Sequence, residues 1–213
     1  MARKILMAMA LTLFFVGGLA AQTEGFSIGA RVIGIKPSYE PSSDLKNELG
    51  SYSIGLDSDL KIGFAVQASY NFTETFGIQA EALYNSDEIT IKRQGYEEGT
   101  IKASSLLIPV LARVGTTVGN GIQLTGLAGI YFTIPIGDGE ISRTGGSLKG
   151  DWKGSMGAML GGVVGYQVGS GTIFADIRYG FDTSETEFTY YGTTEKILKK
   201  SAIHFGIGYS IPL

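Results

Sequence analysis

The 213-residue chain contains no cysteine, only five prolines and a single histidine. The absence of cysteine excludes a disulfide framework and thiol-based zinc or redox chemistry. After the first 21 residues, no apolar stretch reaches the roughly 20 residues that a membrane-spanning helix needs, because Gln, Arg, Asp or Gly interrupts each one. We therefore do not expect the mature chain to be a helical membrane protein.

The N-terminal segment has the order of a secretory signal peptide. Two basic residues, Arg3 and Lys4, precede an uncharged apolar stretch that ends in small residues. This order predicts a signal peptide over residues 1–21, cleaved after Ala20 or after Ala21. A single anchoring helix is the alternative, but the apolar part is too short to span a bilayer.

The remaining residues, 22–213, are expected to form one domain. Residues 1–21 hold two of the 17 basic residues and no acidic residue, so this domain has 15 basic and 20 acidic residues and a formal charge of −5. That balance does not favour a nucleic-acid surface. The whole chain has 32 Gly, 11 Tyr and 11 Phe, a composition that suits short strands packed tightly in a small barrel.

Strict alternation of apolar and small or polar residues is the main structural signal. Near the C-terminus, Ile203, Phe205 and Ile207 share one face of a strand, while His204 and Gly206 share the other. The same pattern predicts eight strands, at about residues 26–32, 60–72, 76–85, 106–114, 122–134, 155–167, 173–182 and 203–213. An even number of strands, with an apolar face turned to lipid, predicts an all-β fold: an eight-stranded antiparallel transmembrane β-barrel with up-and-down meander topology.

The connections between these strands alternate in length. Short turns are expected at 71–75, 119–121 and 169–172, and long polar loops at 36–59, 86–102, 137–153 and 183–199. Outer-membrane barrels have short periplasmic turns and longer extracellular loops, so both termini are expected on the periplasmic side. Two aromatic girdles are also expected, with Phe72, Phe76, Tyr166 and Tyr209 near the short turns and Tyr84, Phe132, Tyr179 and Phe181 near the loops.

A soluble barrel of the lipocalin type is the alternative fold. Such a barrel keeps its apolar face inside and its charged face outside. In this chain the apolar face is continuous around the wall, whereas the opposite face carries Gly, Ser, Gln and charge. The pattern therefore favours the membrane barrel, located in the cell outer membrane with lipid around it.

Three of the expected strands resemble the PorT-like family of outer-membrane β-barrels, which shares the small-barrel architecture of the OmpX type. The segments are 76–84, 106–113 and 126–131, similar to the third, fourth and fifth strands of that family. Leu107 and Ser105 stand where the family favours Glu and Tyr. The resemblance implies a small outer-membrane barrel, and by analogy of fold an accessory role in a protein-export apparatus.

The C-terminal strand resembles the assembly signal of outer-membrane barrels, in which alternating apolar residues lead to a terminal aromatic. Tyr209, Ile211 and Leu213 supply the alternation, with Leu213 in place of the aromatic. The resemblance implies that the outer-membrane barrel assembly machinery inserts the chain. We expect a monomer.

Several charged residues face the lumen by parity: Arg31, Lys61, Glu81, Arg113, Asp176, Arg178, Asp182 and His204. Charges inside a narrow barrel must be paired or hydrated, because isolated burial is costly. Eight strands leave room only for side chains or one small ligand. We therefore expect an ion-pair network that plugs the lumen. A narrow channel for ions or small hydrophobic solutes is the alternative.

Catalysis is not expected. His204 with Ser201 or Asp176 is the conceivable nucleophilic arrangement, but His204 lies in mid-strand, and the chain lacks an H-E-x-x-H motif. The glycines of 161–165 lack the Lys-Ser/Thr ending of a phosphate loop, so we interpret them as packing positions inside the barrel. No metal and no cofactor is expected.

The long loops are the remaining functional candidates. Alternation continues from Ile89 to Ile101, which predicts a hairpin above the membrane, and Phe188, Tyr190 and Tyr191 lie in the last loop. An open strand edge could bind a strand of a host or surface protein. Solvated loops with a few aromatics are the simpler interpretation. The sequence therefore favours a structural or adhesin-like role at the cell surface.

Overall fold

The protein is described by a computed structural model that covers residues 24–42, 54–93, 96–119, 121–143, 146–190 and 193–213. The predicted signal peptide at 1–21 lies outside these residues. Within the described ranges no helix is long and apolar enough to cross a membrane. The strands are β1 (Gly25–Pro41), β2 (Ile54–Asp57), β3 (Lys61–Asn71), β4 (Phe76–Arg93), β5 (Tyr96–Val118), β6 (Ile122–Arg143), β7 (Gly146–Trp152), β8 (Met156–Val168), β9 (Gly171–Asp182), β10 (Thr186–Tyr190) and β11 (Thr193–Pro212).

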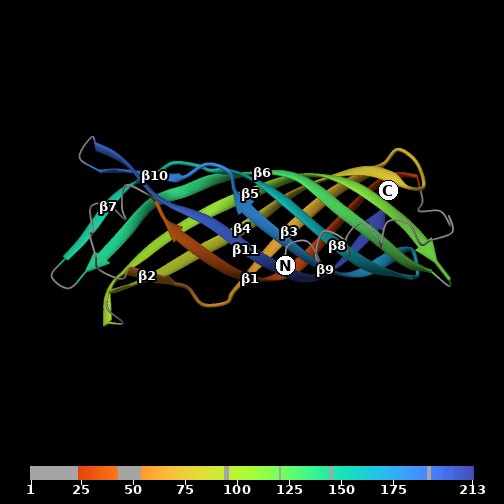
Figure 1. The fold of residues 1–213 in the computed structure, drawn as a ribbon. Coiled ribbons are helices and arrows are strands. Elements are labelled where there is room, and N and C mark those ends of the chain that lie inside the picture. The colour runs from red at the N-terminus through yellow and green to blue at the C-terminus, as the bar shows by residue number, and fades with distance from the viewer. Residues whose placement is uncertain (1–23, 43–53, 94–95, 120, 144–145, 191–192) are drawn as a thin grey trace, which may run out of the picture.

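Eight long strands close into a ring (Figure 1). Each is antiparallel to its neighbours, in the order β1, β3, β4, β5, β6, β8, β9, β11 and back to β1. The ring closes where Ile28 of β1 lies opposite Ile211 of β11. The predicted eight-stranded meander is therefore confirmed, and a ring leaves no strand edge open in its closed part.

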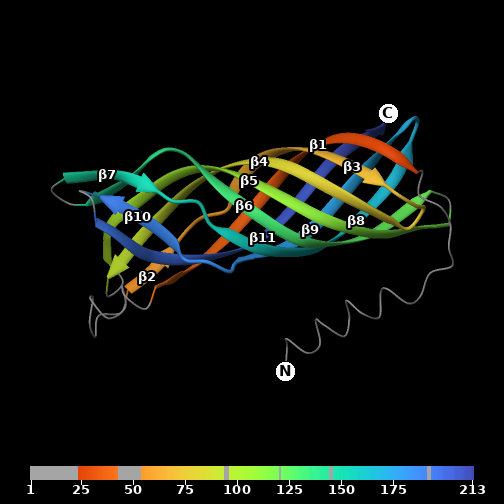
Figure 2. The same cartoon turned by 90° about the horizontal axis from the view of Figure 1, so that it is seen from above.

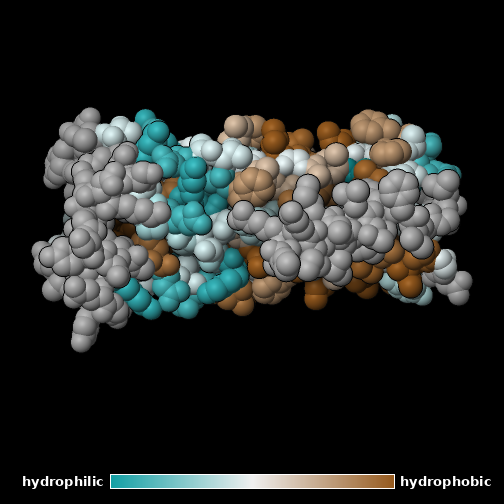
Figure 3. Space-filling model, viewed as in Figure 1, coloured by the Kyte–Doolittle hydropathy of each residue, from teal (hydrophilic) through white to brown (hydrophobic). Residues whose placement is uncertain are grey.

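The outer wall of the barrel is apolar and the inner wall is polar or small. Ile62 and Ile207 are 74% and 67% exposed, whereas Glu81 and Arg178 are 4% and 1% exposed. The residues predicted for the two aromatic girdles are all exposed. Apolar residues gather over the part of the barrel near the short turns (Figure 3). This polarity is the opposite of a soluble barrel and fits a wall that faces lipid.

In their described residues, the four segments predicted as long loops are largely strands. β1, β4, β5, β6 and β11 continue past the apolar band, and β2, β7 and β10 pair with them at the same end, away from the C-terminus (Figures 1 and 2). We call this part the extension: the described residues of 36–42, 54–59, 86–102, 137–153 and 183–200. The hairpin predicted from Ile89 to Ile101 is confirmed, because these two residues are paired. Strand pairing also continues into the described parts of the other three segments, which the alternation pattern did not predict.

Two separate hydrophobic cores lie inside the tube. The barrel core lies within the apolar band and contains Ile33, Ile35, Ala65, Leu83, Leu107, Leu111, Leu127, Tyr131, Met159 and Ala202. The extension core contains Tyr39, Ile89, Ile101 and Leu198, with Leu56, Ile91, Ile141 and Trp152 packed against it. The extension therefore has its own apolar interior and is a folded continuation of the barrel.

Candidate functional site

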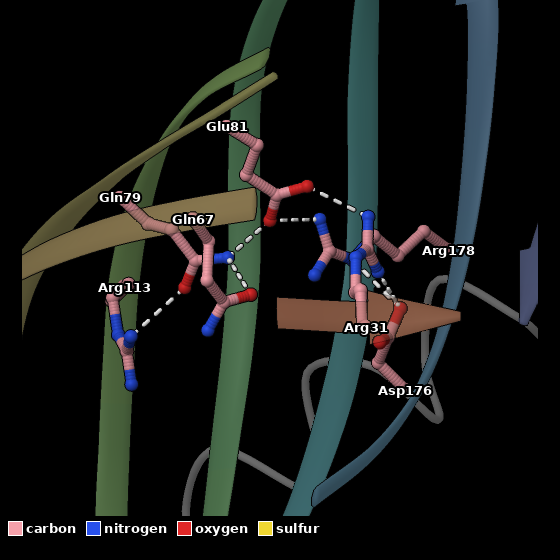
Figure 4. Close-up of polar contacts among 7 residues, drawn as sticks. All are labelled: Arg31, Gln67, Gln79, Glu81, Arg113, Asp176 and Arg178. Atoms are coloured by element: carbon pink, nitrogen blue, oxygen red, sulfur yellow. Dashed lines mark hydrogen bonds and ion pairs between the residues drawn. The ribbon is translucent and has the colours of Figure 1, made fainter. Parts of the chain in front are cut away.

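Four buried charged residues form a closed set of ion pairs in the lumen (Figure 4). Arg31 Nη2 donates to Glu81 Oε2 at 2.7 Å, and Arg178 Nη1 donates to Glu81 Oε1 at 2.6 Å. Arg31 also pairs with Asp176, and Arg178 Nε lies 2.9 Å from Asp176 Oδ1. Each arginine therefore contacts both carboxylates. We call these residues the ion-pair cluster.

The ion-pair cluster joins distant parts of the wall. Arg31 lies on β1, Glu81 on β4, and Asp176 and Arg178 on β9. In the ring, β5, β6 and β8 separate β4 from β9 on one side, and β3, β1 and β11 separate them on the other. Glu81 and Arg178 therefore come from opposite walls, and their contact crosses the whole lumen.

Glycine makes room for the arginine side chains at two places. A Cβ at Gly161 would lie 2.5 Å from the Ile177 carbonyl oxygen and 2.7 Å from Arg178 Cγ. A Cβ at Gly208 would lie 2.7 Å from the Cβ of Arg31. Within 161–165, the close approaches at Gly161 and Gly165 support the interpretation of these two glycines as packing positions, whereas a Cβ at Gly162 would meet its nearest atom only at 3.9 Å.

Amides extend the ion-pair cluster toward a third arginine. Gln79 donates through Nε2 to Glu81, and the same nitrogen lies 3.4 Å from Gln67 Oε1. Arg113 Nη1 donates to Gln79 Oε1 at 2.8 Å. Arg113 is therefore connected to Glu81 only through a neutral amide.

The barrel core fills the lumen between the ion-pair cluster and the extension. A cavity of about 20 Å³ beside it is lined by Leu83, Leu107 and His204, among others, and has room for about one water molecule. Leu107, where the PorT-like family favours Glu, belongs to this core. In the described residues the lumen is therefore crossed by a charged layer and then by an apolar one.

A polar collar borders the barrel core on the extension side. The Tyr131 hydroxyl donates to Asp182 Oδ1 at 2.5 Å, and the backbone N–H of Lys200 donates to Asp182 Oδ2 at 3.1 Å. Lys200 Nζ pairs with Asp87 Oδ2 at 2.6 Å and lies 5.9 Å from the ring centre of Tyr39. Burial is the largest effect on Asp87 and opposes its ionisation. The charge of Lys200 and the hydrogen bonds from Lys200, Asn85 and Tyr39 together hold the pKa of that carboxyl below its ordinary value.

The remaining predicted lumen residues lie apart from the ion-pair cluster. Lys61 is half-buried where β3 meets the extension, with Nζ 3.9 Å from Glu88 Oε2. His204 is buried and is opposite Arg178 in the β9–β11 register. Ser201, three residues earlier in the same strand, is on the opposite face, so the structure does not bring it to His204. Asp176, the other partner considered for His204, already pairs with Arg31 and Arg178.

The described residues contain no group of three or more His, Cys, Asp or Glu that could hold a metal.

Tyr209, Ile211 and Leu213 all face outward at the short-turn end of the barrel. The backbone N–H of Leu213 donates to the Phe26 carbonyl at 2.9 Å, which ties the chain end to β1.

In the extension, aromatic side chains pack inward. The rings of Trp152 and Phe188 lie 5.1 Å apart, and Phe188 is 2% exposed. Phe188 therefore offers no surface to a partner, contrary to its predicted place in a solvated loop. Tyr191 lies outside the described residues. Exposed ion pairs such as Lys92 with Asp57 and Lys153 with Glu187 cover the outer face.

Sequence reasoning missed several residues of the site. Gln67 and Gln79 lie on the same faces of their strands as Lys61 and Glu81, so the alternation pattern could have added them to the predicted lumen residues. Asp87 lies in a segment interpreted as a loop, and Lys200 lies between the last predicted loop and the last predicted strand, so parity was not applied to either.

A family model described as "Outer membrane protein beta-barrel domain" matches residues 21–182. Among solved structures, the outer membrane protein OprG from Pseudomonas aeruginosa is similar, with 13% identity, 92% of this chain and 99% of that one covered, and a TM-score of 0.62. Neisserial surface protein A has 15% identity, coverage of 89% and 98%, and a TM-score of 0.53. The outer membrane protein AlkL has 12% identity, coverage of 93% and 96%, and a TM-score of 0.53. No curated protein matches the sequence.

At these identities the solved structures establish a shared fold, and the family model covers most of the chain. The protein therefore belongs to the family of outer-membrane proteins with a β-barrel domain, and it resides in the outer membrane.

Proposed function

We propose that this protein is a non-conducting outer-membrane barrel that acts through its extension as a surface-interaction module. The observation that carries the proposal is the pairing of charged side chains across the lumen. The Glu81–Arg178 pair crosses the full width of the barrel, and the barrel core fills the next layer. Removing one partner of a buried pair costs about 3–5 kcal/mol, so spontaneous opening of this layer would be rare.

The extension supplies the working surface. Short turns of outer-membrane barrels face the periplasm and the longer connections face outward, so the extension projects from the cell. Its own core, with Trp152 against Phe188, makes it a packed platform with a polar, charged outer face. A packed surface loses less conformational entropy on binding than a mobile loop does.

Finer proposals about the subgroup of the family and the route of insertion rest on the sequence motifs. The motifs at 76–84, 106–113 and 126–131 favour the PorT-like group. The alternation that ends at Leu213 favours insertion by the barrel assembly machinery, after a signal peptide at 1–21 has been removed and the monomer has been exported.

Adhesion of whole cells tests the surface role. The test compares the protein with a variant in which residues 91–99 are replaced by Asn-Gly, a two-residue turn that joins the paired Thr90 and Thr100. Cells that expose each protein are measured on surfaces coated with collagen or laminin. We expect several-fold weaker adherence of the variant.

Heat-modifiable gel migration serves as the control, because it reports whether the variant barrel is folded. Equal adherence of both folded proteins, or no adherence of either above cells without the barrel, would contradict the surface role. Discrete single-channel conductance of the unaltered protein would favour the narrow channel instead.

A further inference from the structure

A second lumen cavity lies beside Arg113 and Arg178, on the far side of Gln67 and Gln79 from the barrel core. Its volume is about 30 Å³. Two guanidinium groups line it, together with the side chains of Gln123 and Ser210. No carboxylate lines it among the described residues.

The charges around this cavity do not balance. Arg31 and Arg178 share the two carboxylates of Glu81 and Asp176, so these four residues are neutral as a set. Arg113 donates to the neutral amide oxygen of Gln79 and points away from Glu81 (Figure 4). Within the described ion-pair cluster and its amides, the charge of Arg113 is therefore left over.

Two guanidinium N–H donors beside the cavity have no hydrogen-bond partner among the described residues. Arg113 Nε and Arg178 Nη2 are buried without a hydrogen-bond partner, and the Arg178 side chain is only 1% exposed. Leaving a buried donor unsatisfied costs about 1–3 kcal/mol. Water in the cavity could accept these hydrogen bonds, but it would not neutralise the cation.

We propose that this cavity binds a small inorganic anion of halide size, held by Arg113 and Arg178. The cavity has room for about two water molecules, which is enough for a halide. The bound anion neutralises Arg113 and accepts from the unused guanidinium donors. It completes the charge balance of the lumen, and the site is independent of any surface partner.

Anomalous diffraction from crystals grown in sodium bromide tests the site directly. We expect one bromide peak within hydrogen-bonding distance of both guanidinium groups. The peak is lost in Arg113→Gln and kept in Lys199→Gln, which removes one exposed positive charge in the extension. No peak in this cavity of the unaltered protein would overturn the proposal, whether or not the Arg113 variant folds.

Thermal unfolding provides a second readout in solution. The midpoint of the unaltered protein should be about 2–4 °C higher in sodium chloride than in sodium gluconate at equal ionic strength. Gluconate is the reference because it is a bulky organic anion of the same charge. The difference should vanish in Arg113→Gln and persist in Lys199→Gln. An equal chloride response in both variants would show general screening and would refute the site.

Discussion

Arg178 Nη1 and Glu81 Oε1 lie 2.6 Å apart although the two residues come from opposite walls of the barrel. Both side chains are essentially inaccessible to solvent. Two ions taken out of water are stable only when good geometry and further hydrogen bonds compensate their desolvation. Here Arg31 and Asp176 provide that compensation. Loss of any one of the four residues should therefore destabilise the charges of the others.

Glu81→Gln should destabilise the barrel by about 3–5 kcal/mol, because it leaves two arginines sharing one carboxylate. Urea unfolding of the protein refolded in lipid vesicles measures the change. Glu88→Gln is the matched control. Its side chain is 50% exposed and pairs only with Lys61 and Lys102, so its loss should cost less than about 1 kcal/mol. Equal costs for the two variants would contradict the central role of Glu81.

Two adjacent glycines should respond differently to the same substitution. A Cβ at Gly161 would collide with Arg178, whereas the nearest atom to a Cβ at Gly162 is 3.9 Å away. Gly161→Ala should therefore cost about 1–3 kcal/mol, and Gly162→Ala should be neutral to within about 0.5 kcal/mol. The same unfolding assay compares them. A tolerated Gly161→Ala would mean that Arg178 does not pack on this wall.

Phe188→Ala should unfold the extension and leave the barrel intact. The substitution removes a ring buried against Trp152, the one tryptophan of the chain, at a cost of about 3–5 kcal/mol. Trp152 emission should shift to longer wavelength while heat-modifiable migration is retained. Phe181→Ala, which removes an outward ring, serves as the control. Unchanged emission in the Phe188 variant would argue against a packed extension core.

The extension should loosen at acid pH because of Asp87. Lys200 keeps the pKa of Asp87 below its ordinary value, so the pair contributes stability above the ordinary pKa of about 3.9 and loses it as the pH falls through the lowered pKa. Trp152 emission followed from pH 6 to about pH 2 should change over that window. In Asp87→Asn the step should be absent, and Asp57→Asn, which removes an exposed carboxylate, should retain it. A step that persists in Asp87→Asn would have another origin.

The ring of strands could be predicted because a membrane barrel repeats one rule, apolar outside and small or polar inside, on every strand. The same parity indicated the lumen positions of Arg31, Glu81 and Arg178. It could not indicate which of them meet, because contacts across the lumen depend on the stagger of strands far apart in the sequence. In the extension, only the hairpin from Ile89 to Ile101 was predicted. The other parts were missed because their polar outer face resembles a loop, while their few inward apolar residues, such as Leu198, are too sparse to show a period.

Conductance of the refolded protein, without residues 1–21, in a planar bilayer tests the sealed lumen most directly. The sample is first shown to be folded by heat-modifiable migration, and an Arg113→Ala/Arg178→Ala variant is recorded alongside. A silent bilayer for the unaltered protein is the predicted result, because the ion-pair cluster and the barrel core both cross the lumen. Steady, discrete openings of the unaltered protein that change in size in the double variant would contradict the account and identify a pore.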